Sequence, residues 1–220
     1  SYEVFPLSFA EYLGFRGIVP ESYSAPAEAA TAAALDDYLE TGGLPEVVLA
    51  EPALRPRVLK EYADLVFYRD LVERHHLASP AVMRELLRHC LASPASLLNP
   101  HKLYQDFRSR GLALGKDTLY RYLGFLEDAY LIFAVPVAER SLRKRAMQPK
   151  KLHVVDWALG YPYRPGAMID RGHKLENAVF LHHRRQRDDL AYRAGPGEID
   201  LVVGATQAEA WVNSAWSLAD

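Results

Sequence analysis

The sequence predicts a mixed α+β protein. Helical apolar periodicity dominates the first half of the chain, whereas short apolar runs typical of strands follow residue 131. Residues 99–151 read as helix, turn, helix, strand, basic turn and strand. That order is typical of a winged helix, whose second helix can present its outer face to a nucleic-acid groove. Half of the 220 residues are apolar, which is enough for a sizeable core.

Residues 1–78 are predicted to form a helical N-terminal region. Pro6 and Ser8 introduce a short helix, and an alanine-rich helix follows over residues 29–40. A long amphipathic helix is expected over residues 51–77. Because the chain has no initial Met and opens like the end of a strand, we expect a fragment with another domain upstream.

Residues 79–155 contain the predicted winged helix, whose first helix covers residues 81–91. Asn99 can cap the next helix, since Pro100 at the first helical position has no amide hydrogen to lose. Another helix begins near Lys116, and its apolar residues recur with a helical period. These residues are Leu119, Tyr122, Leu123, Leu126 and Tyr130. The remaining elements are a strand at 131–135, a basic hairpin tip at 140–145 and a strand at 151–155.

Residues 156–220 are predicted to form a smaller α/β segment. A loop is expected over residues 161–166, and a helix over residues 172–185. Three short strands are expected at 190–194, 198–203 and 208–215, with a hairpin turn at Gly195-Pro-Gly197 between the first two.

The distribution of charge points to nucleic acid as a partner. The net charge of the chain is −2, yet residues 101–151 hold 11 Lys and Arg against 5 Asp and Glu. A basic island in an otherwise acidic chain is a better sign of nucleic-acid binding than the total charge. The alternative is a scaffold whose charges are solvated or meet the acidic N-terminal part.

If the island binds DNA, its outward side chains divide into two groups. One group would face a groove, and its members on the second helix are Lys116, Thr118, Tyr120 and Arg121. The other would contact phosphates from the wing, and its members are Arg143, Lys144, Arg145, Lys150 and Lys151. The second helix has no Asn or Gln, which predicts weak sequence specificity.

Several other classes of protein find no support in the sequence. The single cysteine, Cys90, excludes an internal disulfide and favours a reducing cytoplasm. No apolar run approaches the roughly 20 residues that span a bilayer. The pairs His75-His76 and His182-His183 are poor zinc ligands, because adjacent helical residues point about 100° apart.

Seven blocks of the sequence resemble, in the same order, AAA-type ATP-binding proteins of archaea and bacteria. The blocks are YEVFPLSFAEYL, GGLPEVVL, EYADLVFYRDLVERH, KLYQDFRSRGLALGKDTLYRYLGFLEDAYLIF, PKKLHVVDWALG, KLENAVFLHHRR and GEIDLVV. The resemblance implies a P-loop ATPase core upstream, then a winged helix and a fold similar to the restriction-endonuclease core. ATP and Mg²⁺ would belong to that absent core, which would also be a partner of this chain. No phosphate-binding Gly-rich loop is present in the 220 residues.

The nuclease-like fold implied by this resemblance needs carboxylates that hold Mg²⁺ and a lysine near the attacking water. By position, the resemblance assigns Glu176 on the helix, Asp200 on the first strand, Asn213 at the second acid and Ala215 at the lysine. Neither Asn nor Ala can do that work, so we expect a degenerate site with Asp200 as its best metal ligand. Lys174 could supply a relocated charge and Glu209 a displaced acid.

The resulting expectation is a C-terminal fragment of a cytoplasmic AAA-type ATPase that binds DNA through its winged helix. Oligomers are compatible with such a parent. The nuclease-like segment is expected to be incomplete, because such folds usually need another helix and strand beyond Asp220. One alternative is an active Mg²⁺-dependent nuclease. The other is a protein-contact or regulatory module that touches no nucleic acid.

Overall fold

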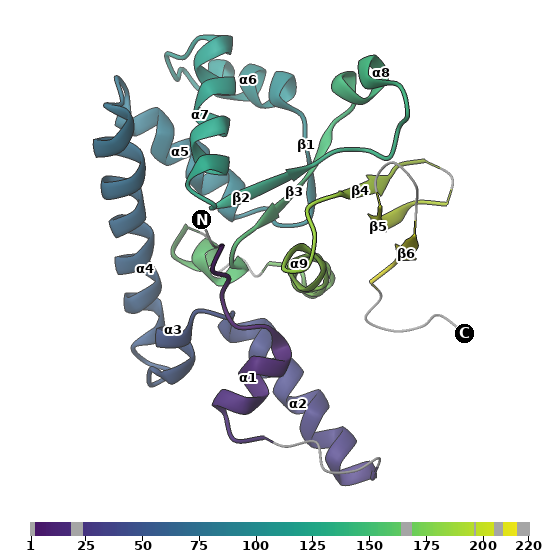
Figure 1. The fold of residues 1–220 in the computed structure, drawn as a ribbon. Helices are drawn as coiled ribbons and strands as arrows, with labels where there is room; N and C mark the ends of the chain where they lie inside the picture. The colour runs from purple at the N-terminus through teal and green to yellow at the C-terminus, as the bar shows by residue number, and fades with distance from the viewer. Residues whose placement is uncertain (1–2, 19–23, 164–168, 196, 205–208, 215–220) are drawn as a thin grey trace.

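The structure is a computed structural model that describes residues 3–18, 24–163, 169–195, 197–204 and 209–214. It confirms the mixed α+β class, with helices around two small antiparallel sheets (Figure 1). None of the helices in these ranges is long and apolar enough to cross a membrane.

The N-terminal region is helical, as predicted. Its helices are α1 (Phe9–Phe15), α2 (Ala25–Thr41), α3 (Pro45–Leu49) and α4 (Arg55–Val66). Ser8 starts α1 through a capping box, because its hydroxyl accepts from the Glu11 amide while the Glu11 carboxylate accepts from the Ser8 amide at 2.7 Å. The long helix predicted over residues 51–77 begins later and continues beyond α4 as a π-helix, Phe67–Glu73. Helix α3 was not predicted.

The central elements follow in the predicted order, with two additions. They are α5 (Pro80–Leu91), β1 (Ser96–Leu98), α6 (Pro100–Ser109), α7 (Lys116–Asp128), β2 (Ile132–Val135), α8 (Leu142–Met147) and β3 (Lys150–Val154). The Asn99 side chain caps α6 by accepting from the amides of His101 and Lys102 at 3.0 and 3.1 Å. Strand β1 was not predicted.

The prediction of a basic hairpin tip at residues 140–145 was wrong in its local structure. Strands β2 and β3 do pair in antiparallel fashion, but helix α8 lies in the connection between them. Ser141 caps this helix through Lys144, and the helix formers Leu, Arg, Lys and Ala continue it.

The C-terminal segment begins with a 3₁₀-helix, Trp157–Tyr163, whose last three residues were predicted as the start of a loop. Helix α9 (Arg171–Arg184) and strands β4 (Leu190–Arg193), β5 (Ile199–Val203) and β6 (Ala210–Val212) follow. The rest of the predicted loop (residues 164–166), the turn residue Pro196 and the strand ends Ala208 and Ala215 lie outside the described residues.

The two sheets meet at one point. Their strand orders are β1-β3-β2 and β4-β5-β6, and every neighbouring pair within them is antiparallel. Just after β2, Val137 pairs with Tyr192 of β4 in a parallel bridge. The Tyr192 amide donates to Pro136 and its carbonyl accepts from Ala138. The strand orders place β3 in the centre of the first sheet and β5 in the centre of the second.

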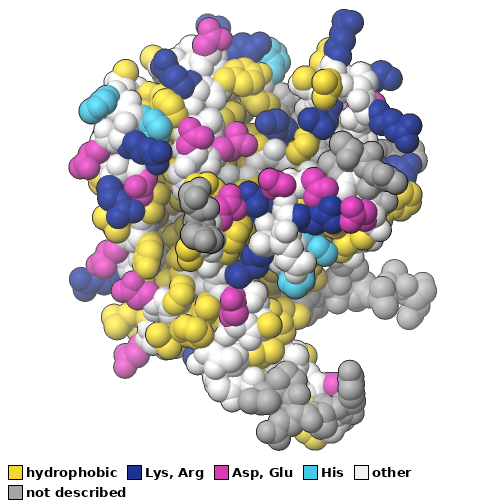
Figure 2. All heavy atoms as spheres, in the orientation of Figure 1, with side chains coloured by type: hydrophobic (Ala, Val, Ile, Leu, Met, Phe, Trp, Pro, Cys, Tyr) yellow, Lys and Arg dark blue, Asp and Glu magenta, His cyan; other side chains and the backbone are white. Residues whose placement is uncertain are grey.

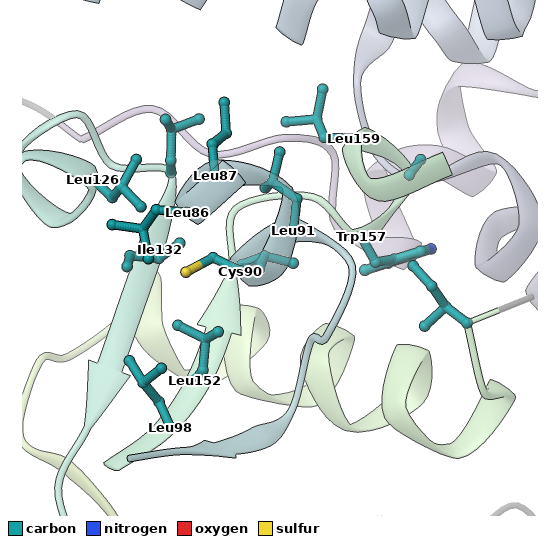
Figure 3. Close-up of a cluster of buried hydrophobic side chains, with 14 of the residues drawn as sticks. Leu86, Leu87, Cys90, Leu91, Leu98, Leu126, Ile132, Leu152, Trp157 and Leu159 are labelled. Atoms are coloured by element: carbon teal, nitrogen blue, oxygen red, sulfur yellow. The ribbon is translucent and has the colours of Figure 1, made fainter. Parts of the chain in front are cut away.

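One hydrophobic core extends through all three predicted segments. Leu86, Cys90 and Leu91 of α5 pack against Leu152 of β3 and against Trp157 (Figure 3). The indole of Trp157 donates to the carbonyl of Leu39 at 2.8 Å, which ties the C-terminal segment to α2. A packed core of this kind holds β3 rigidly, and β3 carries Lys150 and Lys151.

A buried carboxylate joins the residues that follow α2 to the segment that follows β3. Asp156 accepts from the amide of Gly43 at 2.7 Å and from that of Ala158 at 2.8 Å. Gly42 has φ +80°, and a Cβ atom there would come within 2.3 Å of the Asp156 carboxylate, so glycine is required. Burial raises the pKa of Asp156 to about 6, although these amides oppose the shift.

Candidate functional site

Helix α7 holds its apolar stripe inside and its predicted DNA-facing residues outside. Leu119, Tyr122, Leu123 and Leu126 are buried, as the helical period indicated. The prediction was wrong for Tyr130, which is 48% exposed because α7 ends at Asp128 and Tyr130 follows in a left-handed conformation. Of the four outward positions, Lys116, Tyr120 and Arg121 are exposed, whereas Thr118 is half-buried. Helix α6 packs against α7.

The basic residues between β2 and β3 are also mostly exposed. Arg143 and Lys144 lie on the outside of α8, and Lys150 at the start of β3 is exposed as well. Arg145 is half-buried. Figure 2 shows Lys and Arg side chains gathered at the corner of the molecule where Figure 1 places α8, with hydrophobic side chains beside them.

Most Lys and Arg side chains between residues 101 and 151 lack ion-pair partners, unlike those in the rest of the described chain. Of the 11 Lys and Arg between residues 101 and 151, only Arg110 and Lys151 make ion pairs with described residues. Elsewhere in the described chain most Lys and Arg are paired. The exceptions there are Lys60, Arg74 and Arg193. The α6–α8 end therefore presents cations that no neighbouring carboxylate neutralises.

A pocket lies between the two groups of basic residues. Its volume is about 400 Å³, and it is lined by the solvent-facing side of α7, the start of α6 and the residues from Ala146 to Lys150. Tyr120, Gly124 and Glu127 line it from α7, at spacings that place them on one helical face. Met147 lines it from α8 and is 78% exposed.

The prediction that Lys151 contacts phosphate was wrong. Lys151 is only 3% exposed, because its side chain lies on the face of β3 where Glu176 of α9 and Asp200 of β5 meet it, whereas Lys150 lies on the other face at the exposed start of the strand. The Lys151 ammonium lies 2.5 Å from Oε1 of Glu176 and 3.0 Å from Oδ1 of Asp200. The structure thus brings a lysine to the two carboxylates that the resemblance assigned to a nuclease-like site.

The three charged groups form a shielded cluster, which we call the Lys151 cluster (Lys151, Glu176 and Asp200). Glu176 comes from α9 and Asp200 from β5, and their side chains are 12% and 23% exposed. The other oxygen of Asp200 accepts from the amide and the hydroxyl of Ser214 at 2.9 and 3.0 Å. The side-chain oxygen of Asn213 accepts from the Asp200 amide at 3.0 Å, so Asn213 supports the strand.

The electrostatics of the Lys151 cluster differ from one member to the next. Burial raises the pKa of Glu176 to about 7, even with the Lys151 ammonium beside it. Burial works against a low pKa at Asp200 too, but the Ser214 amide and Lys151 hold the pKa of Asp200 below its usual value. Burial also opposes the charge of Lys151, yet Glu176 and Asp200 raise the pKa of its ammonium.

The two relocated groups considered for this site lie elsewhere. Lys174 is buried and pairs with Glu40 of α2 at 2.7 Å. Glu209 pairs with Arg187 at 2.6 Å on the surface. Ala215, the position assigned to the lysine, lies outside the described residues. The sequence signal for Lys151 was its place at the head of a buried strand, where a lysine needs a carboxylate partner.

The family model described as "Domain of unknown function (DUF8612)" matches residues 32–162. The chain belongs to this family. The DUF8612 region includes every predicted DNA-facing residue, the pocket and Lys151, whereas Glu176 and Asp200 lie beyond it. No solved structure matches the chain.

Relatives of this DUF8612 protein occur in archaea and bacteria. An uncharacterized protein of Methanocaldococcus jannaschii, MJ1544, is 32% identical over 91% of this chain and 46% of its own length. An uncharacterized protein of Haemophilus influenzae is 23% identical over 90% of this chain and 47% of its own length. The chain therefore spans about half the length of these two relatives.

The Lys151 cluster of this DUF8612 protein does not fit a magnesium ion in its present arrangement. Mg²⁺ prefers six oxygen ligands in near-octahedral geometry. Here an ammonium group lies between the two carboxylates, at hydrogen-bonding distance from both. No group of three or more His, Cys, Asp or Glu side chains able to hold a metal occurs among the residues that the structure describes.

Proposed function

We propose that this chain is a DNA-binding module of an AAA-type ATPase, with a nuclease-like segment that does not catalyse. The observation that carries the proposal is the surplus of exposed cations without ion-pair partners on α7, α8 and the start of β3. Such cations gain by neutralising phosphates and releasing counterions, which supplies most of the affinity of sequence-independent binding.

A winged helix is the arrangement that best accounts for this end of the fold. Helices α5, α6 and α7 pack around a three-stranded sheet, and the strand between α5 and α6 pairs with β3. In a winged helix, the last helix and the β2–β3 connection flank the nucleic acid. Here these elements are α7 and the α8 connection, and they carry the unpaired cations.

The lack of catalysis follows from the Lys151 cluster. A metal-dependent nuclease needs its carboxylates free to bind the cation that activates water. In this chain the Lys151 ammonium pairs with both Glu176 and Asp200 from within the fold. We therefore assign the cluster to stability, where a single ammonium takes the place of a metal.

The ATPase part of the proposal rests on the ordered sequence blocks that resemble AAA-type proteins. About half of each relative lies outside the aligned region. The proposal places the ATP- and Mg²⁺-binding core of such a parent there.

Binding to a short random duplex, followed by fluorescence anisotropy at increasing salt, tests the proposed function. We expect log affinity to fall with log salt by about 0.9 for each phosphate neutralised. Arg143→Glu with Lys144→Glu should weaken binding to every sequence alike, because phosphate contacts carry no sequence information. Lys60→Glu with Arg74→Glu is the matched control. Both are exposed cations without ion pairs to described residues, Lys60 on α4 and Arg74 directly after the π-helix.

Two results would contradict the proposal. Binding that is absent, or equally weakened by both double variants, would favour the protein-contact module instead. The exposed Leu142 and Met147 on α8 would then be the surface to examine. Mg²⁺-dependent cutting of plasmid DNA that Asp200→Ala abolishes would instead establish the active nuclease.

A further inference from the structure

The pocket between α7 and α8 has the size of a small-ligand site. At about 400 Å³ it falls within the range of roughly 300–1,000 Å³ typical of such sites. Tyr120 lies on one side of it and is 48% exposed. Met147 of α8 and Pro149, just before β3, also line it. An aromatic residue and apolar side chains in a pocket of this size suit a flat aromatic or heterocyclic ring.

A glycine keeps this pocket open. Gly124 lies in the interior of α7, where glycine costs roughly 0.5–1 kcal/mol of helix stability relative to alanine. No atom lies within 4 Å of the position that a Cβ atom would take, so no close contact in the fold explains the glycine. The space above Gly124 belongs to the pocket, and a larger side chain would fill it.

Polar groups in the pocket can recognise the edge of a ring. Glu127 lies one turn beyond Gly124 on the same face of α7 and can accept hydrogen bonds. His101 and Gln148 also line the pocket and offer both donors and acceptors. Carboxylates in nucleic-acid complexes accept from the exocyclic amino group of cytosine. Adenine and guanine also carry such amino groups, whereas thymine has none.

The cations around the pocket fit a polyanion. Lys150 lines the pocket itself, Arg143 and Lys144 lie on the helix that forms one wall, and Arg121 is adjacent to Tyr120. None of these four makes an ion pair with a described residue. Aromatic side chains for bases, set in a positively charged groove for the backbone, are the general pattern of single-strand binding.

We propose that this pocket binds an unpaired base of single-stranded DNA, with the flanking phosphates on Lys150, Arg143 and Lys144. This inference rests on the proposed function and narrows it to a substrate class. A duplex keeps its bases stacked and paired, so a base enters the pocket only from a single strand or after it has left the duplex. Glu127 then favours amino-bearing bases over thymine.

The test compares the 220-residue chain on labelled oligo(dC), oligo(dT) and duplex DNA, with single strands of about 12 nucleotides. We expect oligo(dC) to bind more tightly than both oligo(dT) and the duplex. Tyr120→Ala should weaken oligo(dC) binding about 5- to 150-fold, the range for loss of one stacked base, and by a larger factor than it weakens duplex binding. Phe15→Ala is the matched control, because Phe15 is a half-exposed aromatic residue at the end of α1.

A second variant closes the pocket without disturbing the fold. Gly124→Leu introduces a better helix former at a position with open space, so α7 should remain folded. We expect it to abolish the preference for oligo(dC) while circular dichroism and duplex binding stay close to wild type. Glu127→Gln should reduce the preference for oligo(dC) over oligo(dT).

The outcomes separate the inference from the proposed function. Equal affinity for single strands and duplex, unchanged by Tyr120→Ala and Gly124→Leu, would overturn the inference and leave the proposed function intact. Tighter binding of oligo(rC) than of oligo(dC) would overturn DNA as the occupant. Salt-independent or absent binding to all the oligonucleotides would contradict both proposals.

Discussion

Lys150 and Lys151 are neighbours on β3, yet they belong to two different regions of the molecule. Lys150 is exposed beside the pocket and has no ion-pair partner among the described residues, whereas Lys151 is buried between Glu176 and Asp200. The alternation of the strand places the two side chains on opposite faces, and Lys150 is exposed because it begins the strand, whereas Leu152 and Val154 on its own face are buried. The comparison teaches that the basic residues of this chain have two roles. Buried cations stabilise the fold, and exposed cations remain available to a ligand.

The largest effect is expected from breaking the buried region. Lys151→Met leaves two shielded carboxylates without their cation, which should lower the free energy of unfolding by about 3 kcal/mol. Lys150→Met removes the same side chain from the exposed face and should leave the urea midpoint nearly unchanged. Urea unfolding of the two variants measures the difference. Equal effects would mean that the two lysines are not distinguished as described.

The pH dependence of stability comes next in size. The pKa of Glu176 is raised from 4.5 to about 7, so the folded state holds this proton more tightly than the unfolded state between those values. Stability from this group is therefore present below about pH 4.5 and is lost as the pH rises to about 7. Glu176→Gln cannot ionise and so avoids this loss. The free energy of unfolding of the variant relative to wild type should rise by on the order of 3 kcal/mol between pH 4.5 and pH 7. Urea midpoints at several pH values measure it, and a constant difference would contradict the raised pKa.

Two glycines extend the comparison to packing. Gly124→Ala adds a methyl group in open space within α7 and should stabilise the fold by about 0.5–1 kcal/mol. Gly160→Ala is the opposite case, because its Cβ atom would come within 2.3 Å of the Leu91 carbonyl oxygen, and it should destabilise. Thermal unfolding measures both. Destabilisation by Gly124→Ala would show that the pocket is closed in solution.

The smallest effect on stability is expected at the exposed cations. Arg143→Gln with Lys144→Gln should leave the unfolding midpoint unchanged, because these side chains make no ion pair within the described chain. The same double variant should reduce the salt slope of DNA binding by about 2, or roughly 0.9 for each lost phosphate contact. If the unfolding midpoint shifts while the salt slope of DNA binding stays constant, Arg143 and Lys144 stabilise the fold and do not bind DNA.

Local signals in the sequence predicted much of the fold. The period of Leu119, Tyr122 and Leu123 and the cap at Asn99 depend on residues a few positions apart, and the structure bears them out. Helix α8 was not predicted, because its exposed apolar ends gave no amphipathic pattern that marks a packed helix. The segment boundaries at residues 78 and 155 remain predictions. One hydrophobic core contains residues from both sides of each boundary.

The candidate sites depended on contacts that the sequence does not display. Glu176 and Asp200 were expected to share a site, but the lysine that joins them comes from β3, 49 residues before Asp200. The pocket likewise needs Gly124 and Met147 from elements that meet only after folding. Exposure of Lys116, Arg121 and Arg143 was predicted correctly, because each lies on the polar side of its helix or in a connection.

The most direct test of the account is the salt dependence of duplex-DNA affinity for Lys150→Gln. This change removes the outer charge of β3 and leaves the buried Lys151 cluster intact. We expect weaker binding and a slope of log affinity against log salt that is smaller by about 0.9. A slope and affinity equal to wild type would contradict the claim that the outward cations of this end hold nucleic acid.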